Sequence, residues 1–332
     1  MKAAVVGSGA WGTALAIRLC KNGHDVTMWT FEKDLIPEME STRRNPRLPS
    51  AELPAELKIS GDYACVSGCK LVVMASPSFP ARSVCRGVTP YLDEDAVLVS
   101  VTKGLEEGTH MRMSEVVSQE TGREVVALTG PSHAEEVAVN IPTGLLAACH
   151  NQEMAELVQD AFMADTLRVY TSSDPVGAEL GAALKNVIAL CAGITDGLGC
   201  GDNTKAMLMT RGLTETARLG VALGARKETF TGLAGVGDLI VTCTSMHSRN
   251  RRAGILVGQG KDAQTAMKEV GAVVEGYYAA KSAYELGKAK GIDMPITEAA
   301  YKVLYEGTDV KTTFLGLMSR NRKSESENPG WL

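Results

Sequence analysis

The glycine-rich segment GSGAWG at residues 7–12 constrains the fold of this chain more than any other feature. It follows a short apolar run at residues 3–6 and leads into residues 13–21, whose apolar spacing predicts a helix. In a strand–turn–helix unit, Gly7 permits a tight turn, Gly9 lets the backbone approach a pyrophosphate, and Gly12 lets the helix pack closely on the strand. The helix N-terminus adds free N–H groups, so we expect this segment to bind a dinucleotide.

Short apolar runs alternate with helical segments through the first half of the chain. Runs typical of strands lie at residues 3–6, 26–29, 71–75, 96–101, 125–128, 144–148 and 167–170. Such alternation predicts βαβ units and a mostly parallel sheet. The segment 43–54 is rich in proline and polar residues and is expected to be a surface connection.

The pattern changes after residue 175, where strand signals almost disappear. Helical periodicity covers residues 178–193, 203–223, 250–258, 262–270, 277–291 and 297–305. We therefore predict an α/β protein in which residues 1–180 form a Rossmann-like, doubly wound NAD(P)-binding domain. Residues 181–332 are expected to form an all-helical domain that binds the substrate and carries the catalytic residues.

Composition excludes several classes of protein. The 34 Lys and Arg against 39 Asp and Glu give a net charge of -5, which argues against a general nucleic-acid binder. No uncharged apolar run reaches the roughly 18 residues of a membrane span, and the N-terminus lacks a signal-peptide pattern. The eight cysteines are scattered without a CxxC pair, so we expect reduced thiols in a cytoplasmic protein and no metal site.

Lys185 stands alone as a charge on one predicted helix face. Its neighbours on that face are small or apolar: Ala178, Gly181, Ala182, Ile188, Ala189 and Ala192. Burial disfavours the charged form of lysine, so this amine is suited to proton exchange near neutral pH. Asp238, beside glycines in GVGDLIVT, has two readings that can both hold: a hydrogen bond to Lys185, or the N-cap of a helix.

Cofactor selectivity is expected to depend on residues after the second strand, in the segment WTFEK. Glu32 lies 20 residues after Gly12, in range of an adenosine ribose, where a carboxylate would repel a 2′-phosphate and favour NAD. Phe31 is placed to stack on adenine. The alternative for Glu32 is a solvated loop acid, and Lys33 leaves NADP use open.

Three further segments place polar residues after strands or at a helix start. Lys103 follows a strand in SVTKG, and Gly130 and Ser132 form a polar turn in TGPSHAEE. Arg249 opens a helix in SRNRR, where a guanidinium and free amides together suit a phosphate. The alternatives are an ordinary loop lysine at position 103 and a solvated basic helix face at 249–252.

At this point the chain closely resembles the bacterial-type NAD(P)-dependent glycerol-3-phosphate dehydrogenases, from Met1 to about Arg322. The motifs that carry the resemblance are GSGAWGTAL, SVTKGLE, LTGPSHAEE, ALKNVIALCAGITDGLG, GVGDLIVTCTSMHSRN and VVEG. The resemblance implies interconversion of dihydroxyacetone phosphate and sn-glycerol 3-phosphate, which supplies phospholipid synthesis. It implies a homodimer as well, because the helical domains of this family often pair.

The resemblance also implies roles for individual residues. Lys185 resembles the proton-transfer residue, with Asp238 and Thr242 beside it. Residues that resemble substrate contacts are Lys103, Gly130, Ser132, Lys185, Asp238, Ser248, Arg249 and Asn250. Residues that belong to the expected cofactor site are Gly7, Gly9, Ala10, Trp11, Gly12, Phe31, Glu32, Lys103, Ala134, Arg249, Val273 and Glu275.

Two departures from the family pattern bear on the cofactor. Many bacterial members read GAGSWG, whereas this chain has Ser8 and Ala10, and many carry His or Arg where this chain has Phe31 and Glu32. The second departure favours NAD. The rival interpretations are a related two-domain hydroxy-acid dehydrogenase, with Arg249 binding a carboxylate, and a non-catalytic NAD-binding sensor.

Overall fold

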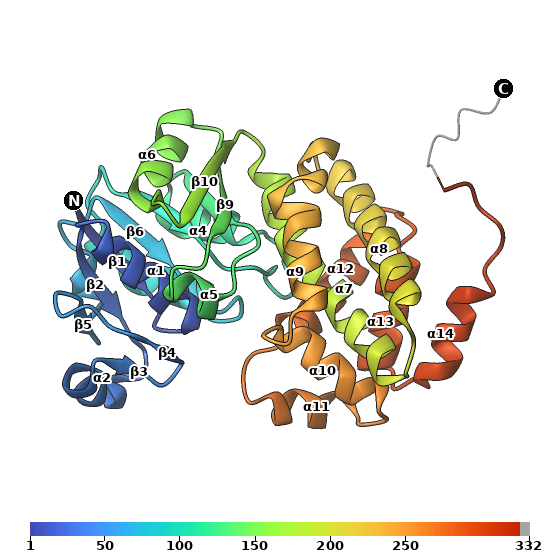
Figure 1. Ribbon diagram of the computed structural model, residues 1–332. Helices are drawn as coiled ribbons and strands as arrows, with labels where there is room; N and C mark the ends of the chain where they lie inside the picture. The colour runs from blue at the N-terminus through green and yellow to red at the C-terminus, as the bar shows by residue number, and fades with distance from the viewer. Residues whose placement is uncertain (326–332) are drawn as a thin grey trace.

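The computed structural model describes residues 1–325, which form a sheet-containing part followed by a helical part (Figure 1). Within these residues, eight strands form one sheet in the order β10-β9-β8-β7-β6-β1-β2-β5. The strands are β1 (Lys2–Val6), β2 (Asp25–Trp29), β5 (Lys58–Ser60), β6 (Leu71–Met74), β7 (Val97–Ser100), β8 (Val125–Thr129), β9 (Thr143–Ala148) and β10 (Leu167–Ser172). The expected mostly parallel sheet is confirmed, with one exception: β8 and β9 are antiparallel.

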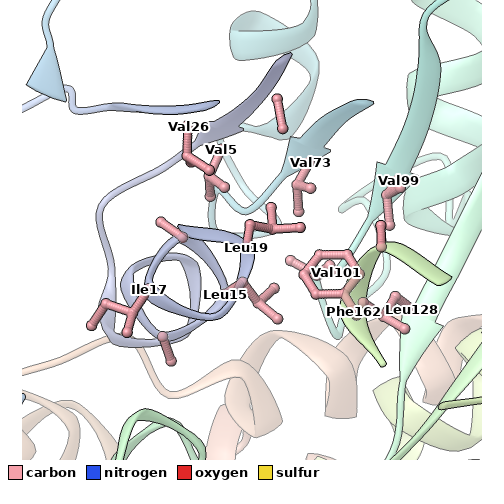
Figure 2. Packing of buried hydrophobic residues seen from close by; sticks show 14 of the residues in the cluster. Val5, Leu15, Ile17, Leu19, Val26, Val73, Val99, Val101, Leu128 and Phe162 are labelled. Atoms are coloured by element: carbon pink, nitrogen blue, oxygen red, sulfur yellow. The ribbon is translucent and has the colours of Figure 1, made fainter. Parts of the chain in front are cut away.

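Helices cover both faces of the sheet, which is why its central strands read as continuous apolar runs. The helices of this part are α1 (Ala10–Lys21), α2 (Ile36–Thr42), α3 (Ala81–Val88), α4 (Met113–Thr121), α5 (Ala134–Ala138) and α6 (Gln152–Phe162). Side chains alternate along a strand, so Val5 packs on one face with α1 and α6 while Val6 packs on the other with α3 and α4. Figure 2 shows Leu15 and Leu19 of α1 close to Val73 and Phe162 in the first of these clusters.

The segment 43–54 differs from its prediction as a plain surface connection. It contains an antiparallel hairpin of β3 (Arg44–Asn45) and β4 (Leu48–Glu52). Asn45 is 1% exposed, and its Nδ2 donates to the Ser8 carbonyl at 2.8 Å and to Thr13 Oγ1 at 2.7 Å. Asn45, one of the polar residues on which the loop prediction was based, therefore anchors the hairpin to the glycine-rich turn.

The helical part is built around the long helix α7 (Pro175–Gly197), nearly all of which is buried (Figure 1). The other helices are α8 (Asp202–Ala222), α9 (Asp238–Thr244), α10 (Arg249–Gly258), α11 (Ala263–Val270), α12 (Glu275–Ala289), α13 (Pro295–Tyr305) and α14 (Val310–Met318). In the described part of the chain, α7 alone is long and apolar enough to cross a membrane, and its apolar window is wholly buried in the protein. The expected division at residue 180 falls inside α7, and the two-domain assignment stays a prediction.

Candidate active site

The glycine-rich turn lies at the carboxyl end of β1, where α1 begins. Gly7 has φ of 134°, and a side chain there would lie 2.6 Å from the Ala75 carbonyl oxygen, while one at Gly12 would clash with the Gly7 carbonyl. A side chain at Gly9, by contrast, would point into open space. Gly9 is the N-cap of α1 and provides no side-chain cap, so the first N–H groups of this helix are available to an anion. This turn fits a pyrophosphate.

Other expected cofactor residues lie around this turn and beyond β2. Ala10 and Trp11 form the first turn of α1, and the indole Nε1 of Trp11 is buried with no hydrogen-bond partner among residues 1–325. Phe31 is 81% exposed and lines a hollow of about 670 Å³ at the end of β2. The carboxylate of Glu32 forms an ion pair with Arg47 and is 40% exposed, so both its cofactor role and the alternative of a solvated loop acid stay open.

Two lysines share one buried carboxylate between the two parts of the molecule. Lys185 Nζ, on α7, donates to Asp238 Oδ1, and Lys103 Nζ donates to Asp238 Oδ2 at 2.9 Å. The side chains of Lys185 and Asp238 are 7% and 1% exposed. Lys103 follows β7, whereas Asp238 begins α9, so the shared carboxylate connects the sheet edge to the helical part. Two ammonium groups on one carboxylate leave the cluster with a net positive charge, which favours an anionic substrate.

Thr242 and the turn after β8 complete the cluster. Lys185 Nζ donates to Thr242 Oγ1 at 2.6 Å, and that hydroxyl donates to the Asp238 backbone carbonyl at 2.6 Å. Lys103 Nζ also donates to the Gly130 carbonyl at 2.8 Å and lies 3.4 Å from Ser132 Oγ. An ammonium group has three donors, and Lys103 uses all of its own here. Within residues 1–325, Lys185 has partners for two, which leaves the third for a substrate oxygen.

Burial sets the proton affinity of this cluster. It lowers the pKa of Lys185 from its usual 10.5 to about 8; the charge of Asp238 opposes this shift, and the charge of Lys103 adds to it. Burial alone would raise the pKa of Asp238, but the two lysine charges and their hydrogen bonds hold it below its ordinary value. Near neutral pH the site therefore combines an ionised carboxylate with an amine that can both give and take a proton.

Buried amides connect the lysine cluster to α10 and α12. Asn186 Nδ2 donates to the Lys103 carbonyl at 3.2 Å, and Asn250 Nδ2 donates to Asn186 Oδ1 at 2.9 Å. The Gly276 N–H in turn donates to Asn250 Oδ1 at 2.8 Å. Asn250 is thus held inside the protein, and the series fixes the first turns of α10 and α12 relative to Lys103.

A second contact between the parts joins Glu275, the first residue of α12, to the loop after β6. Ser78 Oγ donates to Glu275 Oε2 at 2.6 Å, and the Ser78 N–H donates to Oε1 at 3.2 Å. Burial raises the pKa of Glu275, against the Ser78 hydrogen bonds and the nearby charge of Arg249. Glu275, expected in the cofactor site, therefore lies at the carboxyl edge of the sheet.

The remaining expected residues lie around these groups. Ser248 is the N-cap of α10, and its hydroxyl accepts from the Arg251 N–H at 3.2 Å. Arg249 begins that helix and is exposed, Ala134 begins α5, and Val273 is half-buried just before α12. None of the last three has a hydrogen bond or ion pair to the lysine cluster in the described residues, so their roles stay predictions.

One interpretation was wrong, and several residues were missed. Asp238 is not an N-cap, because Gly237 occupies that position after a π-helical turn at Leu233–Gly237. Sequence reasoning did not single out Ser78 or Arg47 and gave Asn186 no role of its own. The available signals were a polar residue in the apolar helix α7 for Asn186 and a serine in the loop after a strand for Ser78.

A separate cavity of about 500 Å³ lies in the helical part, between α8, α13 and α14. Its lining is mostly apolar and includes Leu208, Ile296 and Phe314. None of its lining residues within 1–325 belongs to the lysine cluster or the glycine-rich turn. The lysine cluster and the glycine-rich turn, and not this cavity, therefore define the candidate active site.

A glycine-rich turn suited to a pyrophosphate on a doubly wound sheet, together with a buried lysine whose pKa is lowered to about 8, is typical of a dinucleotide-dependent oxidoreductase. Models for the N-terminus and C-terminus of NAD-dependent glycerol-3-phosphate dehydrogenase match residues 2–155 and 174–315. The chain belongs to this family.

Individual relatives agree over nearly the whole length. The chain is 50% identical over 326 residues to a glycerol-3-phosphate dehydrogenase (NAD(P)+) of Thermoanaerobacter sp. strain X514, covering 98% of this chain and 99% of the relative. It is 50% identical over 323 residues to that of Clostridium acetobutylicum, covering 96% and 97%. The crystal structure of glycerol-3-phosphate dehydrogenase from Coxiella burnetii superposes with a TM-score of 0.92 at 37% identity, covering 96% of this chain and 99% of that one.

Proposed function

We propose that this chain interconverts dihydroxyacetone phosphate and sn-glycerol 3-phosphate with NAD(P), supplying glycerol 3-phosphate for phospholipid synthesis. The family membership and the printed names of the relatives support the activity. The observation that carries the proposal is the buried Lys185, held by Asp238 and Thr242 with one N–H to spare. The models of one glycerol-3-phosphate dehydrogenase family match both parts of the chain. This match argues against the two rival interpretations, a hydroxy-acid dehydrogenase and a non-catalytic sensor.

Lys185 is the proposed acid and base. In the reducing direction its Nζ gives a proton to the ketone oxygen as that oxygen gains negative charge, and in the oxidising direction the neutral amine takes the proton of the hydroxyl. Asp238 and Thr242 hold Nζ in place, and the positive charge of the cluster stabilises the developing alkoxide. The dinucleotide, when bound along Gly9 and the α1 N-terminus, supplies hydride chemistry.

Arg249 and the first amides of α10 are the proposed phosphate site. Arg249 is exposed at the start of a ten-residue helix whose N-terminus favours anions. The asparagine series from Lys103 to Asn250 fixes this helix start relative to the lysines. A phosphate bound there would hold the other end of the triose toward Lys185.

The assay is oxidation of NADH or NADPH with dihydroxyacetone phosphate, against a panel of 2-keto acids. Lys185→Ala, and the volume-matched Lys185→Met, should lower kcat by about 10²–10⁴-fold because the proton donor is lost. Binding of NADH, measured by calorimetry, should stay close to that of the unaltered chain. A kcat within a few-fold of the unaltered chain, or a preference for a keto acid, would contradict the proposal.

A homodimer and a cytoplasmic location belong to the same proposal. Exposed apolar side chains on α8 and α14, namely Met207, Leu315 and Met318, support pairing through the helical part. All eight cysteines are free thiols, which agrees with a reducing compartment.

A further inference from the structure

We propose that the cavity between α8, α13 and α14 binds a fatty acid, with the alkyl chain along its apolar lining and the carboxylate at Arg320 and Lys323. The inference goes beyond the proposed function, because no lining residue within 1–325 belongs to the lysine cluster or the glycine-rich turn. At about 500 Å³, the cavity lies in the usual range of ligand pockets, roughly 300–1,000 Å³. Its position beside α14, at the edge of the helical part, places it away from the sheet (Figure 1).

One wall of the cavity is the apolar face of α14. Val310, Phe314 and Leu317 line it at a spacing of three to four residues, so they share one face of the helix. The structure describes the whole of α14, and no residue of this helix is buried. Apolar residues on one face of a helix usually pack against a core. An alkyl chain in the cavity would cover this face and remove its apolar surface from water, which stabilises the complex.

The other walls come from the core of the helical part. Ile194 of α7, Leu208 of α8 and Ile296 of α13 line the cavity and are buried. Glu215 also lines it, but its carboxylate accepts from the N–H groups of Ile296 at 2.8 Å and Thr297 at 3.2 Å. This acid is therefore held by the start of α13. The aliphatic side chains around it suit a hydrocarbon chain that carries no polar group along its length.

Two cationic side chains share one carboxylate at this cavity. Arg320 Nη2 donates to Asp293 Oδ2 at 3.2 Å, and Lys323 Nζ donates to the same oxygen at 2.7 Å. All three residues line the cavity. Among the residues that the structure describes, neither cation has an ion pair with another carboxylate. The group therefore carries one positive charge more than Asp293 neutralises.

The charge and the exposure of this group select the head group of the ligand. One surplus positive charge matches the single negative charge of a carboxylate, whereas a phosphate monoester carries about 1.5–2 negative charges at pH 7. The side chains of Arg320 and Lys323 are 42% and 59% exposed, and ion pairs this open to water contribute little to stability. A ligand carboxylate can therefore bind the Arg320 guanidinium in the bidentate geometry that arginine favours, while Lys323 stays with Asp293.

The test is calorimetric titration of the full chain with dodecanoate, below the concentration at which dodecanoate forms micelles. We expect one binding site per chain. Ala299→Phe adds a ring to the cavity lining and should weaken dodecanoate binding by about tenfold or more, because the ring takes the place of the alkyl chain. Ala289→Phe, on the exposed end of α12, is the matched control and should leave the affinity unchanged.

The contribution of charge is tested separately. The double variant Arg320→Gln with Lys323→Gln removes both cations and should weaken dodecanoate binding by about fivefold or more. Both side chains are exposed, so this variant keeps the inference testable if Ala299→Phe fails to fold. Dodecyltrimethylammonium has the same alkyl chain with a positive head group, and it should bind the unaltered chain about tenfold more weakly than dodecanoate.

Three outcomes overturn the inference. The first is dodecanoate binding that Ala299→Phe does not weaken, because the ligand then lies elsewhere. The second is equal affinity for dodecanoate and dodecyltrimethylammonium, because the cationic group then has no part in binding. The third concerns the alternative occupant, a second copy of the chain: no dodecanoate binding, together with a dimer that light scattering shows to dissociate in Ala299→Phe. None of these outcomes bears on the proposed dehydrogenase activity, which has its own assay.

Discussion

Lys185 carries its amine in a site that is almost fully buried. Burial favours its neutral form, Lys103 adds repulsion, and Asp238 opposes both, leaving a pKa of about 8. Because the folded-state pKa lies below the ordinary value of 10.5, the amine is charged below about pH 8 and neutral above it. The charged amine can then act as the acid in ketone reduction below about pH 8, and the neutral amine can act as the base in alcohol oxidation above it.

The sign of this shift gives a pH prediction. The kcat of ketone reduction should fall as pH rises through about 8, and that of alcohol oxidation should rise there. Lys103→Met removes a charge that lowers the pKa of Lys185, so both limbs should move to higher pH. Profiles of kcat against pH for both directions test this, with exposed Lys290→Met as control. A limb that stays in place in Lys103→Met would show that another group titrates.

At the scale of elements, the chain pattern predicted the long members and missed the short ones. Continuous apolar strands and the helix α7 were predicted because burial on all sides leaves a clear signature. The helices α9, of seven residues, and α14, of nine, were missed, although α11, of eight, was predicted. In the site, the hydrogen bond between Lys185 and Asp238 was one of two readings of the sequence. The contacts of Asp238 with Lys103 and of Glu275 with Ser78 join distant segments and were not predicted, because local spacing does not show which segments meet.

The packing of α10 on α7 depends on glycines in both helices. Side chains at Gly193 and Gly197 would clash with the backbone carbonyls of Arg251 and Ile255, and side chains at Gly254 and Gly258 would clash with those of Leu190 and Ile194. Each helix thus presents two glycines four residues apart to the backbone of the other. This close approach sets the position of the α10 N-terminus, which carries the proposed phosphate site.

Gly254→Ala should therefore affect both stability and substrate binding. Its methyl group would meet the Leu190 carbonyl, and such overpacking typically costs about 1–3 kcal/mol of unfolding free energy. Displacement of α10 should also raise the KM for dihydroxyacetone phosphate more than that for NADH. Urea unfolding and steady-state kinetics measure the two effects. Gly316→Ala, where a side chain meets open space on α14, is the control; equal behaviour of the two variants would contradict the prediction.

For the molecule as a whole, the proposed acid–base role of Lys185 requires that the sheet edge and the helical part keep a fixed relation. Lys103 comes from one part and Lys185 with Asp238 from the other, so the acid–base cluster exists only when the parts are in register. Glu179, on α7, makes a further connection outside the site. The carboxylate of Glu179 accepts a hydrogen bond from Arg112 Nη1 at 2.5 Å. It also accepts from the N–H and the Oγ of Ser114, at the start of α4, at 2.8 Å and 2.5 Å.

Glu179→Ala tests whether this connection supports catalysis or only folding. The part-buried Arg112 would lose its partner in the helical part but keep Glu115, which is expected to lower the unfolding free energy by about 1–3 kcal/mol. If the register of the parts also depends on Glu179, kcat should fall by about tenfold at temperatures well below unfolding, since even small misplacement of reacting groups is costly. NADH affinity should change little, because the glycine-rich turn lies wholly in the sheet-containing part.

Glu115→Ala is the control: it removes a half-exposed partner of Arg112 and should leave kcat unchanged. A destabilised Glu179→Ala with unaltered kcat would show that the lysine cluster and Glu275 hold the register by themselves.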